Sequence, residues 1–253
     1  LEKASQNIGA VEFARRSLIP SLLEARRINE YRSNERIELF ESAKVYWSAG
    51  EKELPVQPTM IAITSGRSFF DLKGVLQSLV DAIAANVRLE LVKFDHPLLD
   101  IDESGELTIG GKRFGFLGSV SSSGLDQFGL RNPTTVAEFD LGALEKIAVL
   151  IPTHHNQSLF PAVSRDFNLV MADEIRWSDI EQTVRESGGD LLESVNYRET
   201  FRDEQKDGKG TKRVLLGVTL RSPEETLTGD QADAICQDIV AQCERQHGAK
   251  LLG

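Results

Sequence analysis

The stretch Phe160-Pro161-Ala162-Val163-Ser164-Arg165-Asp166-Phe167-Asn168-Leu169-Val170-Met171 determines how the second half of the chain folds. Pro161 cannot lie inside a helix or a central strand, so a regular element is expected to begin after it. From Phe167 to Met171 every second residue is a large apolar one, and Asp166 and Asn168 occupy the alternate positions. This alternation predicts a strand with one buried face.

The segments after this strand alternate between helical and extended patterns. A helix is predicted at 177–187, with Ser178 as N-cap and Glu181 completing a capping box, and Gly188-Gly189 ends it. Thr228 caps a second helix at 230–246, which Gly248 ends. Strands are predicted at 191–197, 213–220 and 249–252, with a polar connection at 202–212. The order β-α-β-β-α-β is that of a ferredoxin-like domain.

The first half predicts an α+β domain built on a mixed, mainly antiparallel sheet. Pro20 is expected to kink the first helix, and Gly110-Gly111 to turn a hairpin. Leu39 and Phe40 are expected to form a local apolar core. The predicted elements are helices at 11–31, 69–85 and 141–146, strands at 37–46, 59–64, 88–94, 107–109, 112–120 and 134–140, a turn at 102–105 and a polar break at 119–124. The apolar side of the second helix is expected to hold Phe70, Val75, Leu79 and Ile83.

Length and charge limit the possible organisation and partners. The 253 residues allow one large or two ordinary domains, and the boundary is placed near Ile151-Pro152, which gives domains at 1–150 and 151–253. The formal net charge of −10 argues against nucleic-acid binding by bulk charge, because phosphate affinity comes mostly from Lys and Arg. An RNA partner must therefore be held by local contacts, and no DNA partner is expected.

The cysteines and the apolar runs indicate the compartment. Cys236 and Cys243 lie seven residues apart on one predicted helix, so their Cα atoms are separated by roughly 10 Å, too far for a disulfide. Two free thiols are typical of a reducing cytoplasm. No apolar run approaches the ~20 residues of a membrane span. Because Leu1 begins inside ordinary sequence, we expect the chain to be a piece of a longer protein.

Four motifs contain residues that could form a catalytic or metal site. The pair His154-His155 lacks further ligands at metal-binding spacing, and an exposed loop explains it better than a metal site. Ser121-Ser122-Ser123-Gly124 lacks the spacing of a nucleophile elbow, and Gly110-Gly111-Lys112 that of a phosphate loop. Asp95-His96-Pro97 is typical of a turn at a strand end. The residues alone therefore predict no catalytic centre and no metal.

The densest basic segment of this acidic chain lies at 206–213, with Arg198 and Arg202 just before it. Acidic residues such as Asp203 and Asp207 dilute its charge. It is either a solvated loop or a loop that contacts phosphates beside a sheet, and the residues alone leave both possibilities open.

Several motifs resemble the C-terminal part of the β chain of bacterial phenylalanyl-tRNA synthetase. Ser21 stands where that family usually has Gly, Phe201 where it commonly has Tyr, and Val120-Ser121-Ser122 where it has L-H-P. The motifs that carry the resemblance are residues 16–25, Leu39-Phe40-Glu41, Phe69-Phe70-Asp71-Leu72-Lys73-Gly74, Phe114-Gly115-Phe116-Leu117-Gly118, residues 160–166, Phe201-Arg202, and Arg221-Ser222-Pro223 followed by Leu227-Thr228.

This resemblance implies a class II synthetase-like domain without catalytic residues, followed by a ferredoxin-fold anticodon-binding domain. ATP, Mg and phenylalanine would be bound by the α chain of a heterotetramer, and this piece alone would bind no cofactor and be inactive. In agreement, the first domain, residues 1–150, contains no FRxE-type arginine motif and no Gly-rich closing motif with its arginine. The implied partners are the α subunit and tRNA(Phe), in the cytoplasm and without a membrane.

There are two rival interpretations of the chain. One is a ferredoxin-like module that senses a small molecule without binding RNA, and the other is a stand-alone enzyme that uses His96 or His154-His155.

The resemblance also implies contact residues. The α-chain interface is expected around Leu18, Leu22 and Leu39. The open face of the C-terminal sheet is expected to meet the anticodon stem-loop through Arg165, Arg198, Arg202, Lys209 and Lys212.

Overall fold

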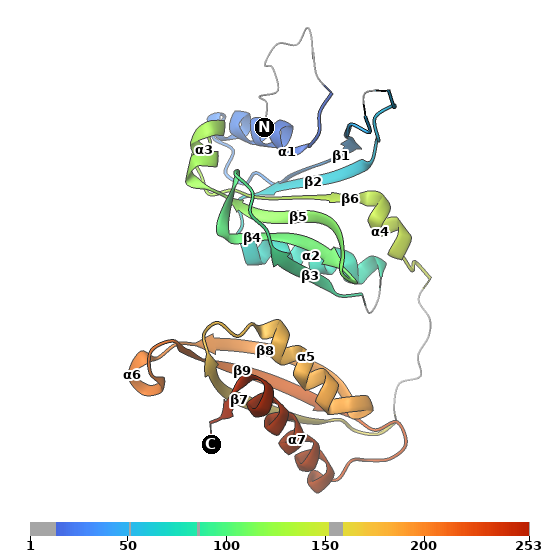
Figure 1. Cartoon of the computed structure of the whole chain (residues 1–253), viewed down its shortest axis with the longest axis vertical. Coiled ribbons are helices and arrows are strands. Elements are labelled where there is room, and N and C mark those ends of the chain that lie inside the picture. Colours follow the sequence, from blue (N-terminus) through green and yellow to red (C-terminus); the bar gives the residue numbers. More distant parts are fainter. Residues whose placement is uncertain (1–13, 51, 85–86, 152–158, 253) are drawn as a thin grey trace. The chain divides into compact units, whose positions relative to one another are not determined.

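The computed structural model describes residues 14–50, 52–84, 87–151 and 159–252, and the chain divides into two compact units at 1–153 and 154–253 (Figure 1). Each unit combines helices with one antiparallel sheet. The predicted α+β class is confirmed, and every strand pair of the first sheet is antiparallel rather than mixed.

Unit 1 is a six-stranded sheet in the order β1-β2-β6-β5-β4-β3. The hairpin between β4 and β5 turns at Gly110 and Gly111, whose φ angles of 55° and 72° favour glycine, as predicted. Its elements are α1 (Ile19–Tyr31), β1 (Leu39–Lys44), β2 (Thr59–Ser65), α2 (Phe69–Ile83), β3 (Leu89–Lys93), β4 (Leu99–Ile109), β5 (Lys112–Val120), α3 (Ser122–Phe128), β6 (Thr135–Asp140) and α4 (Leu141–Ile147).

Two apolar clusters lie on opposite faces of this sheet, because successive residues of a strand point to opposite sides. In β2, Met60 and Ala62 join the cluster under α1, while Ile61 and Ile63 pack against the cluster under α2 and α4. The sheet is therefore the middle layer of unit 1, with helices on both faces.

One buried carboxylate fixes the start of α1 on the sheet. Glu138 lies in β6, is 4% exposed, and its Oε1 accepts a 2.6 Å hydrogen bond from the backbone N–H of Leu18. Burial raises the pKa of Glu138 above its ordinary value of 4.5, and the bond from Leu18 offsets part of this rise. The folded state therefore holds the proton of this group more tightly than the unfolded state does.

We expect Glu138→Gln to stabilise unit 1 increasingly as the pH rises. A raised folded pKa gives stability that is complete below about 4.5 and lost as pH rises through the folded pKa. Gln keeps the oxygen for Leu18 but carries no charge, so its advantage over Glu should grow from pH 4 to pH 8. Glu138→Leu removes the acceptor and should cost about 1–3 kcal/mol.

Urea titrations of a Trp177→Phe background measure this, since Trp47 then reports on unit 1 alone. If the difference in unfolding free energy between the original protein and Glu138→Gln stays the same from pH 4 to pH 8, the raised pKa of Glu138 is contradicted.

Several predicted features of unit 1 are wrong. Pro20 does not kink a helix from residue 11; it lies in the first turn of α1, where its missing N–H costs nothing. Residues 102–105, predicted as a turn, lie within β4, and the predicted break at 119–124 contains the end of β5 and the start of α3, whose N-cap is Ser121.

The predicted apolar faces of α2 and β1 are right in part, since Leu79, Ile83 and Leu39 pack against the buried clusters. The residues of α2 that are buried are Leu72, Leu76 and Val80, whereas Phe70 is 74% exposed. Phe40 of β1 is 77% exposed rather than part of a core. Two large aromatic side chains of unit 1 are therefore left facing solvent.

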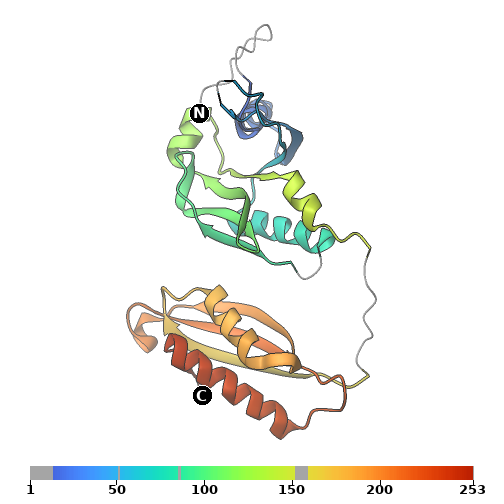
Figure 2. The same ribbon diagram turned by 45° about the vertical axis from the view of Figure 1, so that its right-hand side comes forward.

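Unit 2 is a four-stranded antiparallel sheet in the order β10-β7-β9-β8, with α5 and α7 on one face (Figures 1 and 2). The predicted order β-α-β-β-α-β is confirmed. Its elements are β7 (Val163–Ala172), α5 (Trp177–Gly188), a 3₁₀ turn (Gly189–Leu191), β8 (Leu192–Phe201), α6 (Glu204–Asp207), β9 (Thr211–Leu220), α7 (Gly229–His247) and β10 (Lys250–Leu251).

Details of unit 2 differ from the prediction in three places. The N-cap of α5 is Arg176, whose backbone N–H is bound by Asp179, rather than Ser178. Strand β8 continues four residues beyond 197, and the connection at 202–212 contains α6. Both cysteines are free and buried, as predicted, and burial raises the pKa of the Cys243 thiol to about 11.

Candidate nucleic-acid interface

The two faces of the unit 2 sheet differ in character. The apolar cluster under α5 and α7 takes alternate residues of β7 and β9, among them Phe167, Leu169, Leu216 and Val218. The residues between them point to the opposite face, which we call the open face. From the strand register, the open face carries Asp166, Asn168, Val170, Asn196, Glu199, Phe201, Arg213, Leu215, Gly217 and Thr219.

An irregularity in β8 brings Arg198 onto the open face. The register with β9 shifts between Tyr197 and Glu199, so Arg198 lies at a bulge. Its guanidinium lies over the bare backbone of Gly217, where an added Cβ would be 3.3 Å from Nε of Arg198 and 2.8 Å from Oδ1 of Asp166. Glycine at this position therefore lets an arginine and a carboxylate lie close to the sheet.

A groove of about 540 Å³ lies at one end of the open face, between the sheet and α6. Phe201, 45% exposed, and Asn168, whose Oδ1 is buried without a hydrogen-bond partner, line it from the strands. Arg213 also lines the groove, and Asp207 of α6 accepts two hydrogen bonds of 2.6 Å from it. The groove thus combines an exposed ring, a side-chain amide and a paired guanidinium.

The structure places Arg165 on the wrong face for the predicted RNA contact. Arg165 pairs with Val218 in the register, on the helix-covered side, and its Nη2 lies 2.9 Å from Oδ1 of Asp233 in α7. The phase of the strand explains this, since Arg165 alternates with Asp166 and shares its face with Phe167. We therefore remove Arg165 from the candidate interface.

Arg202 and Lys212 converge on the turn between β7 and α5. Arg202 Nε lies 2.8 Å from Oδ1 of Asp173, and Lys212 Nζ donates to the Asp173 carbonyl at 2.7 Å. Arg202 also lines the groove. Lys209 is exposed in the loop before β9 and forms no ion pair with any residue that the structure describes. Of the five predicted contacts, Arg202 lines the groove, Lys209 lies in the adjoining loop and Arg198 lies on the sheet. Lys212 pairs with the buried Met171 in the register and so, like Arg165, lies on the helix-covered side.

The predicted α-chain contacts are mostly internal. Leu18 and Leu22 are 0% and 5% exposed and belong to the cluster between α1 and the sheet, and Leu39 packs against the same cluster. Because these side chains are covered by their own unit, they cannot be the surface that meets a partner. Two of the exposed aromatic residues of unit 1 are Phe40 and Phe70. Phe40 pairs with Ile63 in the register and so lies on the face that α2 covers.

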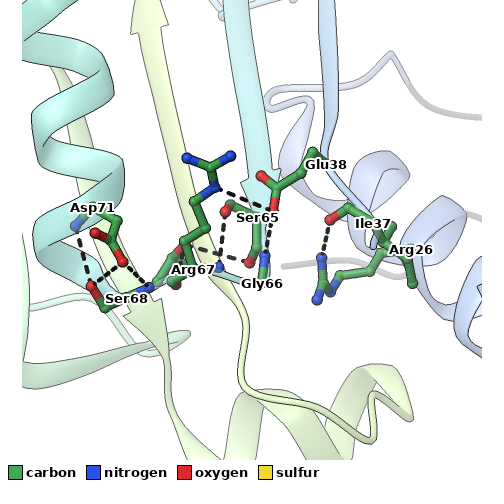
Figure 3. Close-up of polar contacts among 9 residues, drawn as sticks. Arg26, Ile37, Glu38, Ser65, Gly66, Arg67, Ser68 and Asp71 are labelled. Atoms are coloured by element: carbon green, nitrogen blue, oxygen red, sulfur yellow. Dashed lines mark hydrogen bonds and ion pairs between the residues drawn. The ribbon is translucent and has the colours of Figure 1, made fainter. Parts of the chain in front are cut away.

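The arginines around the turn between β2 and α2 are held by groups of the chain itself (Figure 3). Arg26 is 3% exposed, donates to the carbonyl of Ile37 at 2.7 Å, and lies 3.4 Å from the carboxylate of Glu30. Arg67 Nε lies 3.9 Å from Oε1 of Glu38, which also accepts the N–H of Gly66. These contacts fix the turn.

The other candidate motifs take structural positions or lie outside the described residues. His96 stacks on Phe94 and Phe116, and its Nδ1 accepts the N–H of Leu98 at 3.2 Å, as in the predicted turn. His154-His155 lies outside the described residues. In the described part of the chain, no group of three or more His, Cys, Asp or Glu could hold a metal. No helix in that part has the length and apolar character to cross a membrane.

Sequence reasoning missed the residues that line the groove from the strands. The faces of Asn168 and Arg213 could be predicted from their alternation with the buried residues of β7 and β9. The face of Phe201 could not, because the bulge in β8 decides which way it points.

Two family models match the chain. One, described as "Phenylalanyl tRNA synthetase beta chain CLM domain", matches residues 9–141, and the other, described as "Ferredoxin-fold anticodon binding domain", matches residues 158–252. A pyrrolysyl-tRNA synthetase of Desulfitobacterium hafniense, among solved structures, aligns over 53% of this chain and 48% of that chain, with 22% identity and a TM-score of 0.43. That likeness is too slight to carry an argument.

Curated relatives cover nearly all of this chain. The phenylalanine–tRNA ligase beta subunit of Rhodopirellula baltica is 36% identical over 248 residues, which is 94% of this chain and 36% of that protein. The beta subunit of Clostridium tetani is 30% identical over 240 residues, covering 94% of this chain and 30% of that protein. The chain thus spans about a third of the length of these relatives.

Proposed function

The chain belongs to the phenylalanyl-tRNA synthetase beta-chain family, and from this premise we propose that unit 2 binds the anticodon stem-loop of tRNA(Phe) on its open face while unit 1 contacts the alpha subunit. The family resemblance read from the sequence is thereby confirmed. In this proposal the alpha subunit binds ATP and Mg and forms the aminoacyl bond in the cytoplasm, and this chain contributes no catalytic residue.

The observation that supports RNA binding is that Phe201 and Asn168 line the same groove of the open face. Proteins recognise single-stranded RNA bases by stacking them on aromatic rings and by hydrogen bonds to their edges. Phe201 offers a half-exposed ring, and Asn168 offers its side-chain amide beside it in the lining of the groove. A base of the anticodon loop would fit both groups at once.

Phosphate contacts would position the RNA around this groove. Arg198 lies on the sheet, Arg202 at the groove and Lys209 in the adjoining loop, so basic groups flank the ring along the open face. Lys212 lies beside Arg202 at the turn. Such contacts fix orientation and carry the salt dependence of affinity, while base contacts supply sequence preference.

The alpha-subunit part rests on the exposed aromatic residues of unit 1. Phe40 and Phe70 are 77% and 74% exposed. Aromatic residues are enriched in the cores of protein interfaces and often carry most of the binding energy. Phe40 and Phe70 therefore replace Leu18 and Leu22 as the proposed contacts with the alpha subunit.

A matched pair of arginines tests the RNA site. Arg198→Ala should weaken binding of the tRNA(Phe) anticodon stem-loop and lower the slope of log K against log salt by about 0.7–0.9, the loss of one phosphate contact. Arg165→Ala should leave both unchanged, because its guanidinium lies behind the sheet with Asp233. Fluorescence anisotropy between 50 and 200 mM salt measures both quantities. Equal effects of the two substitutions would reject the open face as the site.

A further inference from the structure

A second basic surface lies on unit 1, at the end of α1. Tyr31, the last residue of α1, is 55% exposed, and two guanidinium groups lie over its ring. Arg131, from the loop between α3 and β6, has its Cζ 4.3 Å from the ring centroid, and Arg27 has its Cζ at 5.4 Å. Arg32 follows Tyr31 and is exposed. We call Arg27, Tyr31, Arg32 and Arg131 the arginine platform.

The platform is held in place from below by a buried ion pair. Glu30, 7% exposed, accepts the backbone N–H of Arg131 at 2.8 Å and lies 3.4 Å from Arg26. Arg26 in turn binds the carbonyl of Ile37 (Figure 3). The loop that carries Arg131 is therefore fastened to the last turn of α1, and its side chain is positioned over Tyr31 before any ligand arrives.

The charge of the platform is only partly neutralised. Arg27 is bound by the carboxylate of Glu24. Neither Arg32 nor Arg131 forms an ion pair with any residue in the described ranges. One basic side chain is enough to complement the dipole at a helix C-terminus. Arg32 serves this role at the end of α1, so the dipole does not account for Arg131. In a chain with a formal charge of −10, this concentration of arginine is a local exception.

We propose that the arginine platform is a second RNA-binding surface, which holds the phosphate backbone of an RNA through Arg32 and Arg131. A guanidinium stacked on an aromatic ring keeps its N–H groups directed outward in a fork that fits phosphate oxygens. Protein interfaces are built on an apolar core, whereas nucleic-acid surfaces are polar and strongly basic. The platform is of the second kind, since Tyr31 is its one large ring and is already covered by arginines.

Substitution of both free arginines tests the proposal in the full chain. The double variant Arg32→Gln, Arg131→Gln should lower the salt slope of binding to an unmodified tRNA(Phe) transcript by about 2, and should weaken binding at 150 mM salt by roughly tenfold. Arg245→Gln, an exposed arginine on α7, serves as the matched control and should change neither value. Because both substituted side chains are exposed, the melting temperature should fall by no more than a few degrees, through loss of the contact between Arg131 and Tyr31.

The same measurement in an Arg198→Ala background separates the two sites. If the open face of unit 2 binds no RNA, Arg198→Ala alone has no effect while the platform variant still loses affinity. An unchanged salt slope in the platform variant overturns the proposal, whatever Arg198→Ala does. Binding of a polyglutamate peptide that is lost in the platform variant, with tRNA binding intact, would instead assign the platform to an acidic protein.

Discussion

Phe201→Ala is expected to weaken binding of the tRNA(Phe) anticodon stem-loop by about 1–3 kcal/mol, which corresponds to roughly 5- to 150-fold in affinity. The ring lines the groove on the open face and is 45% exposed, so its removal deletes a stacking surface without opening a core. Phe201→Tyr should retain most of the affinity, because the ring and its position are kept.

The same strand provides the control for this prediction. Tyr197 is 48% exposed, close to the value for Phe201, but it pairs with Leu216 on the helix side and packs edge-on against Trp177. Tyr197→Ala should therefore leave RNA affinity unchanged while lowering stability. Loss of affinity in both variants to the same degree would show that the effect comes from a damaged sheet and not from a lost contact.

The double variant Phe40→Asp, Phe70→Asp should abolish co-elution with the alpha subunit in gel filtration. Each exposed ring would be a central contact of the interface, and truncation of such residues commonly costs at least about 2 kcal/mol. Burying an unpaired carboxylate adds a further penalty. Because both side chains are more than two-thirds exposed in this chain, the variant should fold as the original does.

Val92→Asp is the matched control for the interface. Val92 is an exposed apolar residue of β3, the strand at the opposite edge of the same sheet from β1. It should leave association unchanged. Co-elution that survives in the double variant, with Phe40 and Phe70 both replaced, would remove this face from the interface.

The two faces of β7 were predictable from the sequence, and the buried face of α2 was not. In β7 the two-residue period assigned Phe167 and Asn168 to opposite sides, and the same period already placed Arg165 with the buried residues. In α2 the apolar residues form two stripes, and only packing on the sheet decides that Leu76 is buried and Phe70 is not. The spacing of apolar residues predicts which residues share a face of a helix, but the elements packed against the helix decide which face is covered.

Local backbone irregularities account for what was missed in the site. The bulge at Arg198 shifts the phase of β8, so that Phe201 lies on the open face beside Arg213. No residue pattern in 192–201 indicates this shift. Likewise, the pattern of 202–212 predicts a connection without a helix, although α6 lies there and the pairing of its Asp207 with Arg213 shapes the groove.

Hydroxyl-radical footprinting of the full chain with and without the tRNA(Phe) anticodon stem-loop tests the RNA-binding claim most directly. Phe201 and Tyr197 have similar exposed fractions on the two faces of one strand, so each serves as the reference for the other. RNA bound to the open face should protect Phe201 and leave the oxidation of Tyr197 unchanged. Protection of Tyr197 with Phe201 unaltered, or of neither ring at saturating RNA, would contradict the account.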